Sequence, residues 1–398
     1  DETLKKACCF AFADYLFALA DGHLVAPEGG EGGEGGDEGD DEVEPENPYY
    51  SVFSSTDSNL APGVSQTVNY AYTVDNKQIA YYVATVDIAR KDVSIHANYN
   101  ANDPTKGWAM SRVMDQMLAA QNRHTDPAKP DLYVENYSAV LGVNADFFNM
   151  STGKPSGALV MEGVTYNGVG SENFFAILDD GSAVIGAPSQ WASYADRVQE
   201  AVGGSSFIVK NGENVASKSA NYYNNRASRT SVGITAEGKV VLMVLDGRQE
   251  PFSCGGALEE IAQIMIDAGC VTAINLDGGG SSTFVSKAEG ADELSVVNRP
   301  SDGYQRSVSS SLVVVSTAVV SNEFSYATIS SDYDYLTNYT SLPLTATGVS
   351  ISGHSAQIPE NAYWQVSNEE LGFMDGNVFT ACGYGDVEVY LMVDGTIV

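Results

Sequence analysis

Apolar and polar residues alternate over short segments of this chain, which is typical of β-strands. The strands predicted in the first part of the chain are residues 66–72, 79–86, 93–98 and 139–145. Three hairpins are predicted across the turns Asp179-Asp180-Gly181, Asn211-Gly212 and Glu237-Gly238. Residues 111–121 instead have apolar side chains at helical spacing, with Ser111 as a candidate N-cap. The pattern predicts an α+β domain.

The clearest unit is a strand, a helix and a second strand between residues 240 and 276. The first strand, 240–245, ends at Asp246, and a helix with one apolar face is expected at 257–268. Gly269 ends the helix, and the second strand, 271–276, leads into Asp277. A strand–helix–strand unit joins two parallel strands. We therefore expect Asp246 and Asp277 at one edge of a mixed β-sheet, where such sheets bind ligands.

The two ends of the chain differ from the α+β domain, which is predicted at 49–317. Residues 1–48 end in a run of Gly, Glu and Asp and are expected to be a disordered tail. Their first part resembles an export signal interrupted by Asp14, and an amphipathic helix is the alternative. Residues 318–398 are rich in Ser, Thr, Tyr and Val around Trp364, which predicts a small immunoglobulin-like β-sandwich continuing beyond Val398.

The chain is strongly acidic, with 52 Asp and Glu residues against 20 Lys and Arg and a formal net charge of -32. Such a surface repels nucleic acids and anionic membranes. The sequence also contains no apolar stretch of the ~20 residues that a membrane span needs. We expect neither a nucleic-acid partner nor membrane insertion. The composition favours an extracellular or cell-surface bacterial protein, with cell-wall association through the C-terminal sandwich left open.

The five cysteines and four histidines match no common metal or redox motif. Cys254 and Cys270 flank the predicted helix, which holds them roughly 24 Å apart, beyond the ~7 Å between Cα atoms that a disulfide allows. HExxH, GxSxG and P-loop motifs are absent from the sequence, which argues against zinc hydrolases, nucleophile-elbow hydrolases and P-loop proteins. We expect no required cofactor or metal, and leave open a divalent cation between Asp146, Asp277 and a phosphate.

Four polar groups of residues stand near the ends of predicted strands. They are Asn144 to Asn149, Arg226 with Arg229, Asp246 with Arg248, and Asp277-Gly278-Gly279-Gly280-Ser281-Ser282 with Arg306. Arginine binds phosphate bidentately, and glycines let backbone N–H groups approach an anion. Taken singly, each arginine is better explained by a surface ion pair, and an isolated DGGG by a tight turn. For Asp146 and Asp277 the alternative is that they orient loops and arginines without touching substrate. Together they favour a site for a sugar joined to a phosphate.

The same segments resemble the phosphodiester glycosidase family. The motifs are GVNADFFNM with TGKPSGALV, RASRTSVGIT, VLMVLDGRQ, and INLDGGGSSTF with NRPSDGYQRSVSSSLVVV, and the resemblance covers residues 50–316. It implies an exported hydrolase that converts sugar-1-phosphodiesters, for example α-N-acetylglucosamine-1-phosphodiesters, to free sugar and phosphomonoester. Ala145 departs from the glycine that we expect in the family, and its methyl group is expected to narrow the pocket.

We assign acid/base and stabilising roles to Asp146 and Asp277, with Asp246 in reserve. Arg229 and Arg306 are expected to hold the phosphate, and Arg248 is a further substrate-binding candidate. The backbone amides expected to assist them belong to Gly278, Gly279, Gly280, Ser281 and Ser282, while Asn144 and Asn149 are expected to bind sugar hydroxyls. Two alternatives stay open: another cell-wall or capsular glycan hydrolase, and a non-catalytic glycan-binding surface protein.

Overall fold

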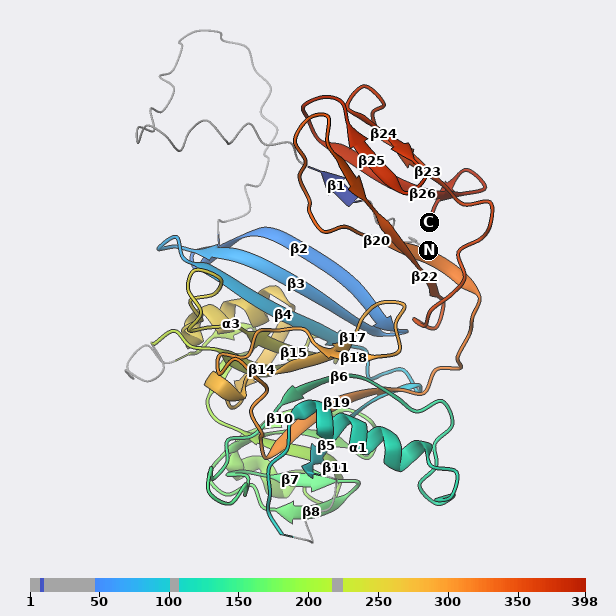
Figure 1. Ribbon diagram of the computed structural model, residues 1–398. Helices are drawn as coiled ribbons and strands as arrows, with labels where there is room; N and C mark the ends of the chain where they lie inside the picture. Colours follow the sequence, from blue (N-terminus) through green and yellow to red (C-terminus); the bar gives the residue numbers. More distant parts are fainter. Residues whose placement is uncertain (1–7, 11–46, 101–106, 217–224) are drawn as a thin grey trace, which may run out of the picture. The chain divides into compact units, whose positions relative to one another are not determined.

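The structure is a computed structural model, which describes residues 8–10, 47–100, 107–216 and 225–398. The chain divides into two compact units (Figure 1). The larger unit contains residues 48–323 with 350–355, and the smaller contains 324–349 and 356–398 with the N-terminal segment. Every candidate site residue lies in the larger unit.

The larger unit is built on an eight-stranded sheet in the order β13-β12-β16-β14-β15-β4-β3-β2. Its strands are β2 (Tyr50–Ala61), β3 (Val64–Thr73), β4 (Gln78–Val86), β12 (Phe207–Lys210), β13 (Glu213–Asn214), β14 (Arg229–Thr235), β15 (Val240–Leu245) and β16 (Cys270–Asn275). The predicted hairpins β12–β13 and β14–β15 are confirmed. Their turns place Asn211, Gly212 and Gly238 at positive φ, where Gly and Asn are the most tolerant residues.

The strand–helix–strand unit is only partly as predicted. Helix α3 (Leu258–Asp267) connects β15 to β16, but β14 lies between these strands and pairs antiparallel with both. The predicted mixed sheet is therefore wrong: in the described residues of the larger unit, every strand pairing is antiparallel. Two successive antiparallel pairings restore the direction, so β15 and β16 still end at the same edge, as the prediction required.

Two five-stranded sheets complete the larger unit. The first has the order β18-β17-β6-β19-β5 and contains β5 (Val93–Tyr99), β6 (Ser138–Asn144), β17 (Phe284–Lys287), β18 (Leu294–Val296) and β19 (Ser310–Ser316). The second has the order β10-β9-β11-β7-β8 and contains β7 (Leu159–Met161), β8 (Val164–Asn167), β9 (Asn173–Leu178), β10 (Ala183–Gly186) and β11 (Val198–Gly204). The predicted hairpin β9–β10 is confirmed. The 3₁₀ turn η3 (Pro188–Ser193) follows β10.

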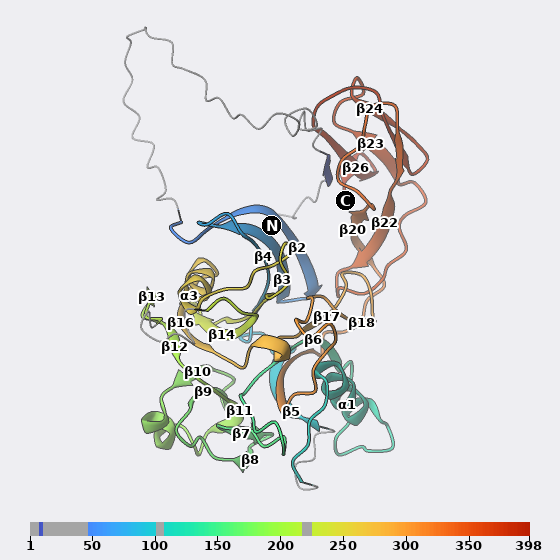
Figure 2. The ribbon, with the colours of Figure 1, turned by 60° about the vertical axis from the view of Figure 1, so that its left-hand side comes forward.

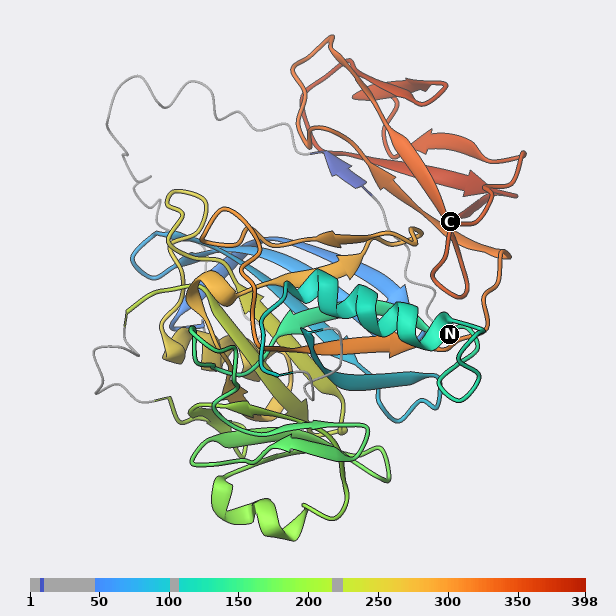
Figure 3. The same cartoon turned by 60° about the horizontal axis from the view of Figure 1, so that its bottom comes forward.

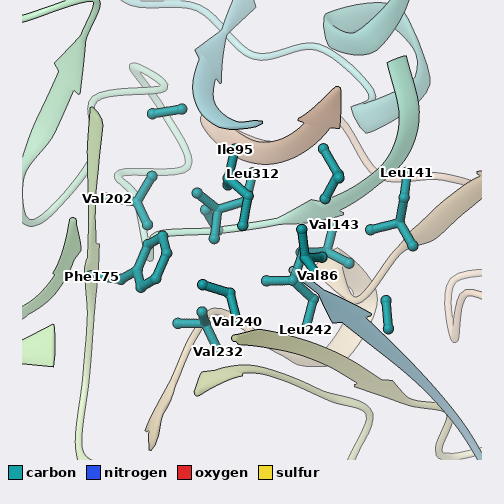
Figure 4. Close-up of a cluster of buried hydrophobic side chains, with 14 of the residues drawn as sticks. Val86, Ile95, Leu141, Val143, Phe175, Val202, Val232, Val240, Leu242 and Leu312 are labelled. Carbon is teal, nitrogen blue, oxygen red and sulfur yellow. The ribbon is translucent and has the colours of Figure 1, made fainter. Parts of the chain in front are cut away.

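The three sheets meet in one apolar core (Figure 4). Val86 and Leu242 come from the eight-stranded sheet, Leu141 from the first five-stranded sheet, and Phe175 and Val202 from the second. Core residues of one strand occupy alternating positions, as Tyr82, Ala84 and Val86 do in β4, so the sheet turns one face toward this core. Burial of this face is the main force that fixes the strand ends carrying the site.

The two long helices cover outer faces of the sheets. Ile261 and Met265 of α3 pack with Met243 and Ala273 of the eight-stranded sheet, and Figure 2 shows α3 beside β16. Helix α1 (Val113–Thr125) packs Val113 and Met117 on the first five-stranded sheet and lies along β6 and β19 in Figure 3. The predicted helix at 111–121 is confirmed, but Ser111 is not its N-cap.

Ser111 instead forms an isolated β-bridge with Val308, and Arg112 occupies the N-cap position of α1 without a side-chain hydrogen bond.

Cys254, Cys270 and Cys382 are free thiols, so the expectation that Cys254 and Cys270 do not pair is confirmed.

The smaller unit consists of short strands around its own core. Its strands are β1 (Cys8–Phe10), β20 (Phe324–Ser330), β21 (Ser341–Pro343), β22 (Thr345–Ser350, whose last residue is counted with the larger unit), β23 (Tyr363–Val366), β24 (Gly372–Asp375), β25 (Val378–Ala381), β26 (Val387–Val393) and β27 (Thr396–Ile397). Its predicted β-structure is confirmed, whereas the immunoglobulin-like arrangement stays a prediction. Cys8–Phe10 pairs with β26, so this part of the predicted disordered tail is a strand. The rest of that tail before Asn47 lies outside the described residues.

Candidate active site

Asp146 follows β6 and is buried. Its Oδ2 atom accepts a hydrogen bond of 2.6 Å from the backbone N–H of Gly157, whereas Oδ1 has no donor in the described part of the chain. Burial raises the pKa of Asp146 to about 8, against the effect of the Gly157 amide, and the nearby carboxylates of Glu172 and Asp277 raise it further. At neutral pH Asp146 therefore carries a proton, as a general acid requires.

Asp277 follows the end of β16 and lies near the Asp146 carboxyl group. Its backbone N–H donates to the carbonyl of Ala145 at 2.9 Å, which ties it to the residue preceding Asp146. Burial raises the pKa of Asp277 to about 6, while the Ser281 side chain, the Gly278 amide and Arg306 oppose that rise. Asp277 is therefore ionised at neutral pH while Asp146 is protonated. The different environments of the two carboxyl groups separate their pKa values.

Asn144 holds these two segments together. Its Nδ2 atom donates to the backbone carbonyl of Asp277 at 2.7 Å, and its Oδ1 atom accepts from the Thr230 hydroxyl at 2.8 Å and the Thr283 amide at 3.1 Å. The side chain is fully buried. The sequence suggested that Asn144 binds a sugar hydroxyl, and the structure gives it a positioning role instead.

Asp246 is also a positioning residue. It is fully buried, and its carboxylate accepts hydrogen bonds from the Asn298 side chain at 2.8 Å, the Arg299 amide at 2.7 Å and the Tyr82 hydroxyl at 3.1 Å. Burial raises its pKa to about 6, against these three donors. Both oxygens hold the chain at 298–299, which argues against the catalytic reserve role suggested by the sequence.

The glycine turn offers fewer free amides than expected. The N–H of Gly278 donates to its neighbour Asp277, and that of Gly279 donates to Ser228. The N–H groups of Ser281 and Ser282 close the 3₁₀ turn η4 (Gly279–Ser281) by donating to carbonyls within it. The N–H of Gly280 has no acceptor outside η4 in the described ranges. The predicted set of five amides for an anion therefore reduces to one.

Two arginines flank this amide. The guanidinium of Arg306 pairs with Asp302 at 2.8 Å and lies directly over Gly280, where an added Cβ would meet both side chains at 2.1–2.4 Å. Arg248 is exposed and lies beside Gly279, where an added Cβ would be 3.5 Å from its Nη1 atom. Arg248 forms no ion pair with any acid that the structure describes, and its φ of 61° is unusual for a residue with a side chain.

The other predicted ligands lie in structural positions. Arg229 is buried and donates to the backbone carbonyls of Gly256 and Asn225. Its guanidinium therefore holds the loops that contain these two residues. Arg226 pairs with Glu260 and Asp75, which is the ion-pair explanation considered from the sequence. Asn149 is exposed and accepts hydrogen bonds from the amides of the turn that follows it.

Three site features were missed from the sequence. The Gly157 amide donates to the Asp146 carboxylate, Glu172 adds negative charge near it, and Asp302 orients Arg306. Gly157 lies within the quoted TGKPSGALV motif, which was the available signal. The side chain of Ala145 is packed in the apolar core, which argues against the predicted narrowing of the pocket. In the ranges that the structure describes, no cluster of three His, Cys, Asp or Glu side chains could hold a metal ion.

Residues 137–315 match the family model described as phosphodiester glycosidase. The mouse protein N-acetylglucosamine-1-phosphodiester alpha-N-acetylglucosaminidase is 33% identical over 161 residues, which cover 36% of this chain and 31% of the mouse protein. The bovine protein of the same name is 31% identical over 160 residues, covering 36% and 30%. The chain thus spans less than a third of the length of these curated relatives.

A solved structure also resembles this fold. It is the catalytic domain of zebrafish N-acetylglucosamine-1-phosphodiester alpha-N-acetylglucosaminidase, auto-inhibited by its pro-peptide, with a TM-score of 0.51 and 18% identity. The similarity covers 67% of this chain and 88% of the zebrafish chain. At this level of identity the similarity concerns the fold alone, and it agrees with the β-rich architecture of the larger unit.

Proposed function

We propose, from the premise that residues 137–315 belong to the phosphodiester glycosidase family, that this chain hydrolyses sugar-1-phosphodiesters to a free sugar and a phosphomonoester. An α-N-acetylglucosamine-1-phosphodiester is the substrate that the relatives' names suggest. The observation that carries the proposal is the pairing of Asp146, protonated and with one oxygen unengaged in the described residues, with the ionised Asp277.

The two carboxyl groups can divide the reaction between them. A water oxygen forms a bond to C1 of the sugar, while the bond from C1 to the phosphate oxygen breaks and leaves its electron pair on that oxygen. Asp146 donates its proton to the leaving oxygen, and Asp277 accepts the proton that the water loses. Before the transfer, the negative charge of Asp277 stabilises the positive charge that develops on the sugar ring.

The phosphate is held by the groups around the glycine turn. The Gly280 N–H has no backbone acceptor outside η4, the Arg248 guanidinium has no carboxylate partner in the described part of the chain, and Arg306 is fixed nearby by Asp302. A phosphodiester carries one negative charge, which two guanidinium groups and an amide can bind. The leaving monoester has a second ionisation near pH 6. The proton of Asp146, shared with the leaving oxygen as the bond breaks, limits the negative charge that builds up beside Asp277.

Export to the cell surface belongs to the same proposal. None of the helices described in the structure is long and apolar enough to cross a membrane. The net charge of -32 and the acidic glycine-rich run before residue 47 support an extracellular or cell-surface location. Association with the cell wall through the smaller unit is a further part of this proposal.

A substrate comparison tests the proposed activity. We expect the protein to release free N-acetylglucosamine from methyl α-N-acetylglucosamine-1-phosphate and to leave methyl α-N-acetylglucosaminide intact, because the plain glycoside lacks the phosphate that the arginines bind. Free sugar is measured by chromatography over time. Release from the glycoside alone would instead support a different glycan hydrolase. Release from neither compound would support a non-catalytic glycan-binding protein.

A further inference from the structure

Three segments of the second five-stranded sheet meet around the Asp146 carboxyl group. Gly157 precedes β7, Glu172 precedes β9, and Gly203 lies in β11 of this sheet (Figure 2). A Cβ atom added at Gly203 would lie 2.7 Å from the Asp146 Oδ2 atom and equally close to the Gly157 Cα atom. A Cβ atom added at Gly157 would lie 2.9 Å from the Glu172 Cβ atom. We call Gly157, Glu172 and Gly203 the sheet wall.

Glu172 is the member of the sheet wall that carries a functional group, and its backbone is fixed. Its N–H donates to the Val169 carbonyl at 3.2 Å. The next residue, Asn173, pairs with Gly204 and donates from its side chain to the Ser205 carbonyl. The Glu172 side chain is half-buried, and its carboxylate forms no hydrogen bond or ion pair with any residue that the structure describes. It is therefore available to a ligand.

The charged groups differ between the two ends of the candidate site. Arg306 lowers the pKa of Asp277, whereas Glu172 raises the pKa of Asp146. Arg248 lies with Arg306 at the glycine turn. The site therefore has a cationic end at the glycine turn and an anionic end at the sheet wall.

These charges distinguish the two parts of a sugar-1-phosphodiester. The phosphate is anionic, so the guanidinium groups attract it and a carboxylate repels it. Sugar hydroxyl groups donate hydrogen bonds, and an ionised carboxylate can only accept them. Such bonds to a charged acceptor are shorter and stronger than those between neutral groups. The sugar ring therefore fits the end of the site that carries Glu172.

The sugar end of the site has no other assigned ligand. Asn144 is fully engaged in hydrogen bonds to the Asp277, Thr230 and Thr283 segments, and Asn149 holds its own turn. The side chains suggested by the sequence for the sugar hydroxyls thus serve the fold instead.

We propose that Glu172 determines specificity for the sugar by accepting a hydrogen bond from a hydroxyl group of its ring. This inference rests on the proposed function, and it adds the residue that recognises the sugar and the direction in which the substrate lies. The sugar ring lies against the sheet wall, and the phosphate lies at the glycine turn. Repulsion between Glu172 and the phosphate disfavours the reverse orientation.

The kinetic test compares methyl α-N-acetylglucosamine-1-phosphate with its 3-deoxy, 4-deoxy and 6-deoxy analogues. In wild type we expect kcat/KM to fall about tenfold or more for one of the three, because that analogue lacks the hydroxyl group bonded to a carboxylate. Glu172→Ala should hydrolyse the same analogue within about twofold of the parent compound, because the acceptor is already gone. Glu172→Gln, whose amide oxygen still accepts a hydrogen bond, should show an intermediate ratio.

Ratios between substrates separate this contact from an effect on the acid. Loss of the Glu172 charge should also lower the pKa of Asp146, but that change affects turnover of all four compounds alike. Glu237→Ala, at an exposed glutamate in the turn between β14 and β15, is the matched control and should keep the wild-type ratios. If Glu172→Ala kept them too, or if wild type hydrolysed all four compounds equally well, the assignment of Glu172 would be overturned.

A second measurement separates failure of this inference from failure of the proposed function. If methyl α-N-acetylglucosaminide and its deoxy analogues are hydrolysed in place of the phosphodiesters, with the same loss of discrimination in Glu172→Ala, the assignment of Glu172 stands and the proposed activity is wrong. If no compound is hydrolysed, calorimetry with N-acetylglucosamine decides. Binding to wild type that weakens about tenfold in Glu172→Ala would support the contact. Equal binding to both proteins, or binding to neither, would overturn it.

Discussion

Asp277→Asn is expected to lower kcat for the phosphodiester by about a thousandfold or more, the upper part of the range for loss of a general base or acid. Asparagine has nearly the same shape, and its Oδ1 atom can still accept the Gly278 amide hydrogen bond of 2.9 Å. It carries no charge, however, so it can neither accept the proton from water nor stabilise positive charge on the sugar ring. The measurement is the steady-state rate of N-acetylglucosamine release at pH about 7.

The matched control for this variant is Asp115→Asn. Asp115 is an exposed residue of α1 that pairs with Arg112, and its substitution should leave kcat unchanged. The melting temperature of Asp277→Asn should not fall, since burial already disfavours the charged form of this carboxyl group. A variant that folds like wild type and retains full kcat would show that Asp277 only orients the glycine turn.

Asp146→Asn is expected to lose turnover and to gain stability at alkaline pH. The pKa of Asp146 is raised from 3.8 to about 8, so the folded protein binds this proton more tightly than the unfolded chain does. The stability that comes from this group is fully present below pH about 4 and is lost as the pH rises through about 8. Asparagine stays neutral, so the variant avoids that loss. Differential scanning calorimetry at pH about 8.5 should show a rise in Tm of several degrees.

The same comparison at low pH provides the control. At pH about 4.5 aspartic acid at this position is protonated in the folded protein, so Tm of Asp146→Asn should be close to that of wild type. Gly157 still has an oxygen to donate to in the variant. If Tm of the variant fell equally at both pH values, the Asp146 side chain would contribute through packing, and its protonation would not explain the change in stability. If activity survived, the proton donor would have to be another group.

The strands of the larger unit could be predicted because apolar residues alternate with polar ones wherever one face of a strand is buried. β15 and β16 end where Asp246 and Asp277 begin, and these boundaries follow from the apolar runs before them. The insertion of β14 between these strands could not be predicted, because local pattern does not determine which strands are neighbours. The common direction of β15 and β16 was predicted correctly even though the mixed sheet was not.

The candidate site shows the same division. Position after a strand predicted Asp146 and Asp277 as candidates, but the sequence does not show whether a side chain already has partners. Asn144, Asp246 and Arg229 look like ligands in the motifs, yet their polar atoms are engaged in buried hydrogen bonds to distant segments. Most amides of the glycine turn are likewise used within the fold. These are long-range interactions, so they became visible only with the tertiary structure.

The pH dependence of kcat/KM for the methyl phosphodiester tests the central claim most directly. Activity requires Asp277 ionised and Asp146 protonated, so kcat/KM should rise through pH about 6 and fall through pH about 8 in wild type. In Asp146→Asn the residual activity should lose the fall at alkaline pH, because the group that titrates there is gone. A wild-type profile without the alkaline fall, or a fall that persists unchanged in Asp146→Asn, would contradict the assignment of Asp146 as the acid.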